Sequence, residues 1–314
     1  MTREPLPEGA RRLDAAVYHA APGMTGHLLS ELGDWDRQDG DLVFRPGPVL
    51  PVRWVRNVWR KPFLLEFSSL GEAASKLRSI QRNWAPCPNR LYRRTALLAE
   101  NLPSLPVKPK AFPFDLPAAP MGAFTLLDEG LLLGSADCLS PFPNGELRFE
   151  EDTEGPPSRA YRKLWEALVL AGKRPGPGDR CLDAGASPGG WTWALAGLGA
   201  SVLAVDRAPL EPRIAALRGV EFRKGNAFSL RPEDVGQVDW LFSDVICYPP
   251  VLYDWVEKWL AAGIARNYIC TIKMQGEDYD RQTTDRFAAI PESRIVHLWH
   301  NKHELTWIKV DSGR

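Results

Sequence analysis

The chain of 314 residues has little cysteine, no net charge and no long apolar run. Its five cysteines are scattered and never spaced as CxxC, which argues against a zinc site and against a disulfide framework, so we expect no metal. No apolar stretch approaches the roughly 18 residues of a membrane helix, and the first residues, MTREPLPEGARRL, lack the apolar core of a secretory signal. Thirty-nine basic and thirty-nine acidic side chains cancel, which disfavours a uniformly basic nucleic-acid coat protein. We therefore expect a cytoplasmic protein without a membrane partner.

The composition is that of an ordinary globular chain, with 44% hydrophobic and 25% charged residues. At ~100–200 residues per domain, its length suggests two domains. Six prolines between Pro103 and Pro120 predict an extended connector. We expect an N-terminal α+β module in residues 1–105, a Pro-rich connector with strands in 106–154, and a second domain in 155–314.

Basic side chains are concentrated in the first half. Residues 51–110 hold twelve Lys/Arg and three acidic residues, a net charge of +9, interleaved with Trp54, Trp59, Trp84 and Tyr92. Such a mixture is typical of a surface that binds a phosphate backbone. A solvated helix face beside ordinary core aromatics is the alternative. The candidate RNA-binding residues are Arg53, Arg56, Arg60, Lys61 and Arg159.

In the second half, short apolar runs alternate with helical patterns. Strands buried on both faces are predicted at 180–183, 201–205, 240–243 and 268–272. Helices are predicted at 158–171 (capped by Ser158), 191–198 and 251–262. This alternation predicts an α/β domain with an open parallel sheet and helices on both faces. Residues 294–310 predict an antiparallel hairpin at the sheet's edge.

The first of these strands runs into a glycine-rich loop, Asp183-Ala-Gly185-Ala-Ser-Pro-Gly-Gly. Asp206 ends the next strand, where a carboxylate can accept hydrogen bonds from both hydroxyls of a ribose. The spacing is GxxxGG rather than the GxGxxG of dinucleotide sites, and Pro188 removes an N–H that a pyrophosphate could use. No GK[ST] follows, which excludes a P-loop. The remaining candidate ligand is S-adenosylmethionine (SAM), which carries no phosphate.

The candidate cofactor-binding residues follow from this loop and from the ends of the later strands. Asn226 and Ala227 are expected at the adenine, although Gly-Asn is also a common turn. The full set is Asp183, Gly185, Ser187, Pro188, Gly189, Gly190, Trp191, Asp206, Asn226, Ala227 and Asp244.

Four ionisable residues occupy positions where such a sheet would carry its chemistry. Asp244 and Lys273 each end a predicted strand, and Glu304 follows the turn of the terminal hairpin. Lys163 lies on its predicted helix opposite the apolar stripe. Taken singly, each has an ordinary structural interpretation.

The segment DAGASPGGWT resembles the cofactor loop of the FtsJ-like RNA ribose 2′-O-methyltransferases, which carry a Lys–Asp–Lys–Glu tetrad in that chain order. Lys163, Asp244, Lys273 and Glu304 match that order. Over residues 155–310 the chain is most similar to the large-subunit rRNA methyltransferase M (RlmM) family. The resemblance implies a Rossmann-like class I methyltransferase domain, with SAM as cofactor, preceded by a shortened THUMP-like or ferredoxin-like RNA-binding module. Asn226 stands where the family's motif has an acid.

The expected chemistry is methyl transfer to a ribose 2′-hydroxyl of RNA. Ribosomal RNA is the expected substrate, and DNA is not expected to be a partner. Lys273 is expected to act as general base, and Lys163 as its cationic neighbour that stabilises the developing alkoxide, since a nearby ammonium lowers the pKa of an amine. Asp244 and Glu304 would orient the two lysines. Two alternatives remain open: a non-catalytic RNA-binding or assembly factor that retains a SAM pocket, and a SAM-dependent enzyme acting on a small molecule.

Overall fold

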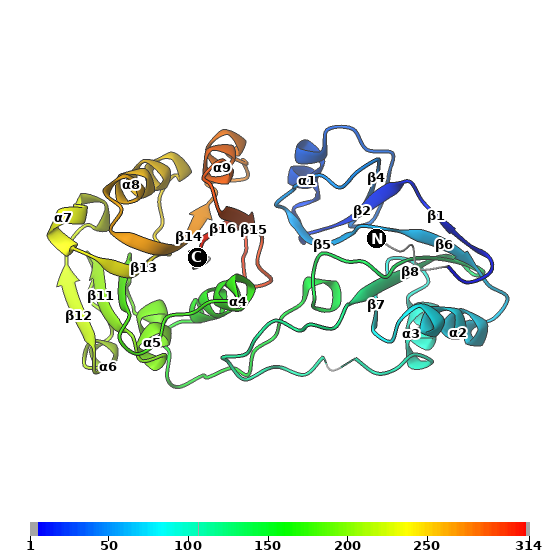
Figure 1. Ribbon diagram of the computed structural model, residues 1–314, viewed down its shortest axis with the longest axis horizontal. Coiled ribbons are helices and arrows are strands. Elements are labelled where there is room, and N and C mark those ends of the chain that lie inside the picture. Colours follow the sequence, from blue (N-terminus) through cyan, green and yellow to red (C-terminus); the bar gives the residue numbers. More distant parts are fainter. Residues whose placement is uncertain (1–5, 106, 312–314) are drawn as a thin grey trace. The chain divides into compact units, whose positions relative to one another are not determined.

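The computed structural model describes residues 6–105 and 107–311, which form two compact units (Figure 1). The first unit contains the chain up to Lys110 together with Leu116–Arg148, and the second contains Ala111–Asp115 and the chain from Phe149 on. No helix of the described residues is both long and apolar enough to cross a membrane.

This division differs from the expected one, because the segment assigned to a connector is shared between the units. Leu116–Arg148 contributes two strands to a sheet of the first unit, where Phe124 pairs with Gly134 and Leu64 with Leu133. Phe112, in contrast, stacks on Trp165 of the second unit with ring centroids 4.6 Å apart. Proline spacing indicates an extended backbone but does not reveal which sheet or side chain that backbone meets.

The first unit is an α+β arrangement of two sheets. One sheet has the strand order β3-β4-β2-β5 and the other β1-β6-β9-β8-β7. The strands are β1 (Ala10–Arg12), β2 (Ala15–Ala20), β3 (Arg37–Asp39), β4 (Leu42–Pro46), β5 (Val55–Trp59), β6 (Phe63–Glu66), β7 (Trp84–Pro86), β8 (Gly122–Asp128) and β9 (Leu131–Ser135). The helices are α1 (Thr25–Leu32), α2 (Leu70–Ile80), α3 (Tyr92–Glu100) and the short 3-10 helix η1 (Pro143–Gly145).

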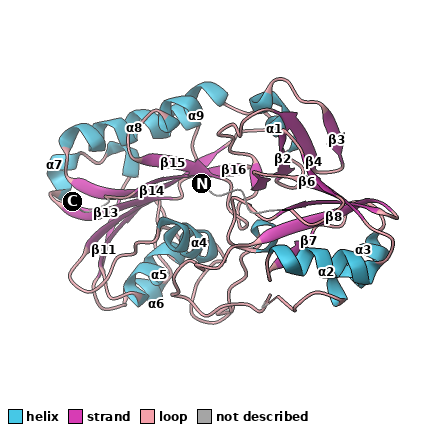
Figure 2. Cartoon of the chain, turned by 45° about the vertical axis from the view of Figure 1, so that its right-hand side comes forward, coloured by secondary structure: helices cyan, strands magenta, loops and turns pink. Residues whose placement is uncertain are grey.

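The second unit is a Rossmann-like α/β sheet of seven strands in the order β12-β11-β10-β13-β14-β16-β15. Its strands are β10 (Arg180–Ala184), β11 (Ser201–Asp206), β12 (Val220–Lys224), β13 (Val238–Ser243), β14 (Ala265–Lys273), β15 (Ser293–Val296) and β16 (Glu304–Lys309). Its helices are α4 (Tyr161–Ala171), α5 (Gly190–Gly197), α6 (Pro212–Ala215), η2 (Ala227–Ser229), α7 (Pro232–Val235), α8 (Pro249–Ala262) and α9 (Arg281–Ala288). Figures 1 and 2 show α4, α5 and α6 on one face of the sheet and α8 and α9 on the other.

The predicted parallel sheet and its antiparallel edge are both present. Strands β10 to β14 pair in parallel, and β16 pairs antiparallel with β14 and with β15. Side chains at the sheet centre, such as Leu182, Leu241 and Ile269, are fully buried, which explains why these strands are continuously apolar. Their register places Ala184, Val205, Ser243 and Cys270 in one row. The residues that follow this row therefore gather at one edge of the sheet.

Helix α4 has the predicted buried stripe but not the predicted start. Tyr161, Leu164, Trp165 and Leu168 are all buried. The expected cap at Ser158 is wrong, because α4 begins only at Tyr161, and the Ser158 hydroxyl instead accepts a hydrogen bond from the Ala160 N–H at 3.4 Å. Residues 158–160 thus form a separate turn that leads into the helix.

Candidate active site

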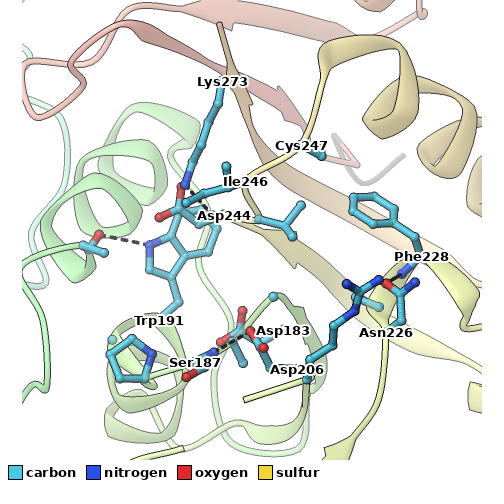
Figure 3. A pocket seen from close by; sticks show the side chains of 18 of the residues that line it. Asp183, Ser187, Trp191, Asp206, Asn226, Phe228, Asp244, Ile246, Cys247 and Lys273 are labelled. Carbon is cyan, nitrogen blue, oxygen red and sulfur yellow. Dashed lines mark hydrogen bonds and ion pairs between the residues drawn. The ribbon is translucent and has the colours of Figure 1, made fainter. Parts of the chain in front are cut away.

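A pocket of about 580 Å³ lies at the carboxyl ends of the parallel strands (Figure 3). This volume falls in the range typical of small-molecule sites. Asp183, Asp206 and Asp244 enter the pocket wall from the ends of β10, β11 and β13. Ligands of open α/β sheets bind at this edge, because the loops that follow the strands diverge there.

The glycine-rich loop lets the backbone approach its neighbours closely. Gly185 has φ +84°, and a Cβ at this position would lie 2.8 Å from Cβ of Val245, in the loop after β13. Asp206 ties the loop to β11, since its carboxylate accepts hydrogen bonds from the N–H groups of Ser187 at 3.0 Å and Ala208 at 2.9 Å. Each carboxylate oxygen has a second lone pair with which it can accept from a ligand hydroxyl.

Asp183 is a buried acid at the floor of the pocket, with 1% of its surface exposed. The Thr192 hydroxyl donates a hydrogen bond of 2.7 Å to its Oδ2 atom. The pKa of Asp183 is raised from 3.8 to about 7. Burial is the main cause, the hydrogen bond from Thr192 opposes the shift, and the charges of Asp244 and Asp206 add to it. A cation bound in the pocket would reverse part of this shift, because it favours the ionised carboxylate.

The raised pKa of Asp183 predicts a pH-dependent stability. The folded state holds this proton more tightly than the unfolded state, so the contribution of Asp183 to stability falls as pH rises from about 4 to about 7. At one pKa unit per 1.36 kcal/mol, wild type should lose about 2–3 kcal/mol from this group between pH 5 and pH 8. Asp183→Asn should therefore be more stable relative to wild type at pH 8 than at pH 5, as measured by calorimetric melting at both pH values.

The matched control for this prediction is Asp254→Asn, which alters an exposed carboxylate on α8. Its melting temperature should differ from wild type by the same amount at both pH values. Equal pH profiles for the two variants would contradict the assignment of a titrating Asp183.

The structure brings Lys163, Asp244, Lys273 and Glu304 together beside the pocket. The Lys163 ammonium lies 2.8 and 2.9 Å from the two carboxylate oxygens of Asp244, and 3.1 Å from Oε1 of Glu304. Lys273 donates a hydrogen bond of 2.6 Å to the Asp244 backbone carbonyl, and its Nζ lies 3.2 Å from Asp244 Oδ1. Figure 3 shows Lys273 and Asp244 pointing toward one another. All four side chains are 12–18% exposed.

The sheet and one buried carboxylate position this cluster. Lys273 and Glu304 are directly opposite one another in the antiparallel pair of β14 and β16. Glu166 on α4 is 3% exposed and accepts hydrogen bonds from the N–H groups of Trp299 at 2.7 Å and His300 at 3.1 Å. This contact holds the hairpin loop against the helix that carries Lys163. Glu166 is a positioning residue that the sequence analysis missed.

The two lysines of the cluster have different surroundings. Burial lowers the pKa of Lys163, but the carboxylates of Asp244 and Glu304 outweigh it and hold that pKa above its ordinary value of 10.5. Lys163 is therefore an ammonium at neutral pH. Lys273, in contrast, contacts a carbonyl and one carboxylate oxygen that Lys163 also contacts.

Most of the predicted cofactor-binding residues line the pocket, but some of their side chains are engaged elsewhere. Gly189 is absent from the pocket wall; a Cβ there would lie 2.8 Å from Ile214 Cγ2. The Trp191 indole N–H donates to the carbonyl of Ala160. The Asn226 amide forms the predicted turn alternative, since it accepts from the Phe228 N–H at 3.2 Å and donates to the Ser229 hydroxyl at 3.1 Å.

In the basic region, the structure supports the alternative interpretation for the tryptophans. Trp54, Trp59 and Trp84 are core residues with at most 2% exposed surface, and Trp59 and Trp84 pack in the apolar clusters of the first unit. Tyr92, however, is 65% exposed. The prediction that these three tryptophans belong to an RNA-binding surface is therefore wrong.

Several of the predicted basic RNA contacts have acidic partners within the chain. Arg53 pairs with Glu31 at 3.2 Å, and Arg60 and Lys61 both pair with Asp137. Arg159 lies 3.3 Å from Glu151 but keeps 73% of its side chain exposed. The Arg53–Glu31 pair is largely buried. The pairs of Arg60, Lys61 and Arg159 are exposed and contribute little to stability. These three basic groups remain accessible to an anion.

The pocket also has wall residues that the sequence analysis missed. These lie next to the predicted ones along the chain or precede α4: Ser158, Ala160, Ala186, Arg207, Gly225, Phe228, Val245, Ile246, Cys247 and Val251. The signal that could have found residues 245–247 is their position directly after a buried parallel strand.

Comparison with known proteins identifies relatives of this chain. The model of the FtsJ-like methyltransferase family matches residues 156–257. Ribosomal RNA large subunit methyltransferase M of Halorhodospira halophila is 37% identical over 157 residues, 48% of this chain and 46% of that protein. The protein of the same name from an Azoarcus species is 30% identical over 258 residues, 77% of this chain and 67% of that protein. Among solved structures, the fibrillarin pre-rRNA processing protein of Methanococcus jannaschii aligns with 50% of this chain at 18% identity and a TM-score of 0.37.

The sheet order, the pocket and the family match define the second unit as a Rossmann-like, FtsJ-like methyltransferase domain. Such domains use S-adenosyl-L-methionine, and the pocket suits that molecule, since three carboxylates face a space large enough for a cationic nucleoside. The chain belongs to the ribosomal RNA large subunit methyltransferase M family. The chain spans about half of the length of the Halorhodospira relative and two thirds of the length of the Azoarcus relative.

Proposed function

We propose that this protein transfers a methyl group from SAM to a ribose 2′-hydroxyl of RNA, with ribosomal RNA as the substrate. The observation that carries the proposal is the convergence of two lysines and two carboxylates from α4, β14, β16 and the end of β13 beside a pocket suited to SAM. The relatives' names point to ribosomal RNA of the large subunit.

The four side chains would divide the work as follows. A ribose hydroxyl is a weak nucleophile until it loses its proton, and Lys273 would accept that proton as a neutral amine. Lys163, which is held as an ammonium, would stabilise the alkoxide that develops. Asp244, which contacts both lysines, would orient the pair, and Glu304 would orient Lys163. SAM, when bound, supplies the electrophilic methyl group on its sulfonium.

Charge balance is compatible with one neutral lysine in this cluster, and Lys163 is the lysine held as an ammonium. With both lysines protonated, the two carboxylates cancel their charge; with Lys273 neutral, the cluster carries a net charge of −1. A cationic ligand in the adjoining pocket stabilises this anionic form.

We further propose that the first unit is an RNA-binding module of the THUMP or ferredoxin-like kind. The net charge of +9 over residues 51–110 supports this role, as do the exposed side chains of Arg60 and Lys61. RNA binding through about six phosphates should weaken steeply with salt, whereas binding of a small-molecule substrate should not.

The proposal predicts transfer of label from [methyl-³H]SAM to unmodified large-subunit rRNA transcribed in vitro. Alkaline hydrolysis should leave the labelled position within an uncleaved dinucleotide, because a 2′-O-methyl group blocks cleavage of the adjacent phosphodiester. The same sequence made as DNA should receive no label, since it has no 2′-hydroxyl.

Other outcomes would overturn the proposal. Label on a base would exclude ribose methylation. If SAM and RNA both bind but neither naked rRNA nor immature large subunits receive label, the protein is a binding factor. Label that appears only on a small molecule would make it a small-molecule methyltransferase.

A further inference from the structure

Exposed apolar side chains of the second unit are concentrated at a single place. Within its described residues, the large hydrophobic side chains that are exposed are Ile246 (79%), Tyr248 (66%) and Val251 (47%). All three follow Asp244 within seven positions, and Ile246 and Val251 also line the pocket. Together they form what we name the 246–251 surface (Figure 3 labels Ile246).

The backbone presents the first two of these side chains on one side. Exposure alternates along the loop before α8, with Ile246 and Tyr248 exposed and Cys247 between them less so. In extended chain such alternation places residues i and i+2 on the same face. The Gln275 amide donates to the Cys247 carbonyl at 3.3 Å, and two prolines begin α8 directly after Tyr248. The loop is thus held in place at its carboxyl end.

The chemistry of the loop indicates an uncharged, flat ligand. Residues 245–253 contain no charged side chain, so a phosphate or a charged peptide would find no partner there. An aromatic ring beside a branched apolar side chain suits the face of a nucleobase, which stacks on such groups. At most about 14 Å separates the Cα atoms of Asp244 and Tyr248, four residues apart.

We propose that Tyr248 and Ile246 form a platform on which the base of the methylated nucleotide stacks, while its ribose lies at the tetrad. This inference rests on the proposed function and extends it to substrate positioning. A base is joined directly to its ribose, so a ribose beside Asp244 and Lys273 brings its base to the residues that follow Asp244. Stacking is sequence-tolerant, so the platform fixes the orientation of the nucleotide and leaves its identity to other contacts.

The test is the affinity of Tyr248→Ala for in vitro transcribed large-subunit rRNA, compared with its affinity for SAM. We expect the Kd for RNA to rise about tenfold or more, as for other stacked bases, while the Kd for SAM stays within twofold. Tyr248→Phe, which keeps the ring, should restore RNA affinity. Gln282→Ala, which removes an exposed, uncharged side chain of α9 in the second unit, should leave both constants unchanged. The salt dependence of RNA binding should match wild type, because no phosphate contact is lost.

The results separate this inference from the proposed function. Loss of RNA affinity in Tyr248→Ala, in a chain whose wild type transfers no methyl group, would retain the platform and reject the enzyme. Active methylation with unchanged RNA affinity in Tyr248→Ala would retain the enzyme and reject the platform. A parallel loss of SAM affinity, or a Tyr248→Phe variant as weak as Tyr248→Ala, would overturn the platform. Once the methylated nucleotide is mapped, an abasic residue there should abolish the difference between wild type and Tyr248→Ala.

Discussion

Lys273→Ala should lose methyl transfer to rRNA by a factor of about 10²–10⁴ in kcat, the usual contribution of a general base. Lys273 contacts the carbonyl and the carboxylate of Asp244 in the wall of the pocket. Its removal leaves Asp206 and the glycine-rich loop unchanged, so the loss should fall on kcat. The Kd for SAM should therefore stay within about threefold of wild type. Single-turnover kinetics with labelled SAM, together with calorimetric titration of SAM, measure the two quantities.

A second substitution distinguishes a base from a mere cation. Lys273→Arg keeps a positive charge but cannot offer a neutral nitrogen, since a guanidinium remains protonated at any pH at which the protein is folded. It should be as inactive as Lys273→Ala. Lys258→Ala, which removes an exposed lysine on α8, serves as the control and should be fully active. Substantial activity in Lys273→Arg would assign Lys273 an electrostatic role and require a different base.

The central sheet was predictable from sequence because its strands are buried on both faces. Continuous apolar runs at 180–183, 201–205, 240–243 and 268–272 correspond to β10, β11, β13 and β14. Asp206 and Asp244 could be assigned to the pocket for the same reason, since each follows such a run. The parallel register then brings them together without any further information from sequence.

What sequence could not supply are the contacts between distant segments. The hydrogen bonds from Trp299 and His300 to Glu166 join residues more than 130 positions apart. No local sequence pattern indicates that a carboxylate on a helix is buried. The tryptophans of the basic region were misassigned because spacing does not distinguish a ring in a core from one on a surface. Nor does sequence show that Lys163 is held as an ammonium, because this depends on the carboxylate oxygens that its nitrogen contacts.

Lys163→Met should impair both stability and catalysis. The thioether keeps the length of the side chain but leaves the carboxylates of Asp244 and Glu304 without their shared cation. Removing one partner of a fully buried pair costs about 3–5 kcal/mol; these groups are 12–15% exposed, so we expect about 2–3 kcal/mol. Loss of the ammonium beside the alkoxide should lower kcat by about 10²–10³. Melting at pH 8 and single-turnover transfer to rRNA measure the two effects.

The two effects of this substitution can be separated by removing one of the stranded charges. Lys163→Met/Glu304→Gln should recover much of the lost stability, since Glu304 would no longer be an unpaired anion, yet it should not recover activity. The stabilisation by Lys163 itself has a defined pH range. Because its folded pKa lies above 10.5, its contribution is complete below that pH and is lost as pH rises through the folded pKa. The difference in melting temperature between wild type and Lys163→Met should therefore be constant from pH 7 to pH 9. A Lys163→Met variant that is less stable but transfers methyl groups at the wild-type rate would restrict Lys163 to holding the two carboxylates in place.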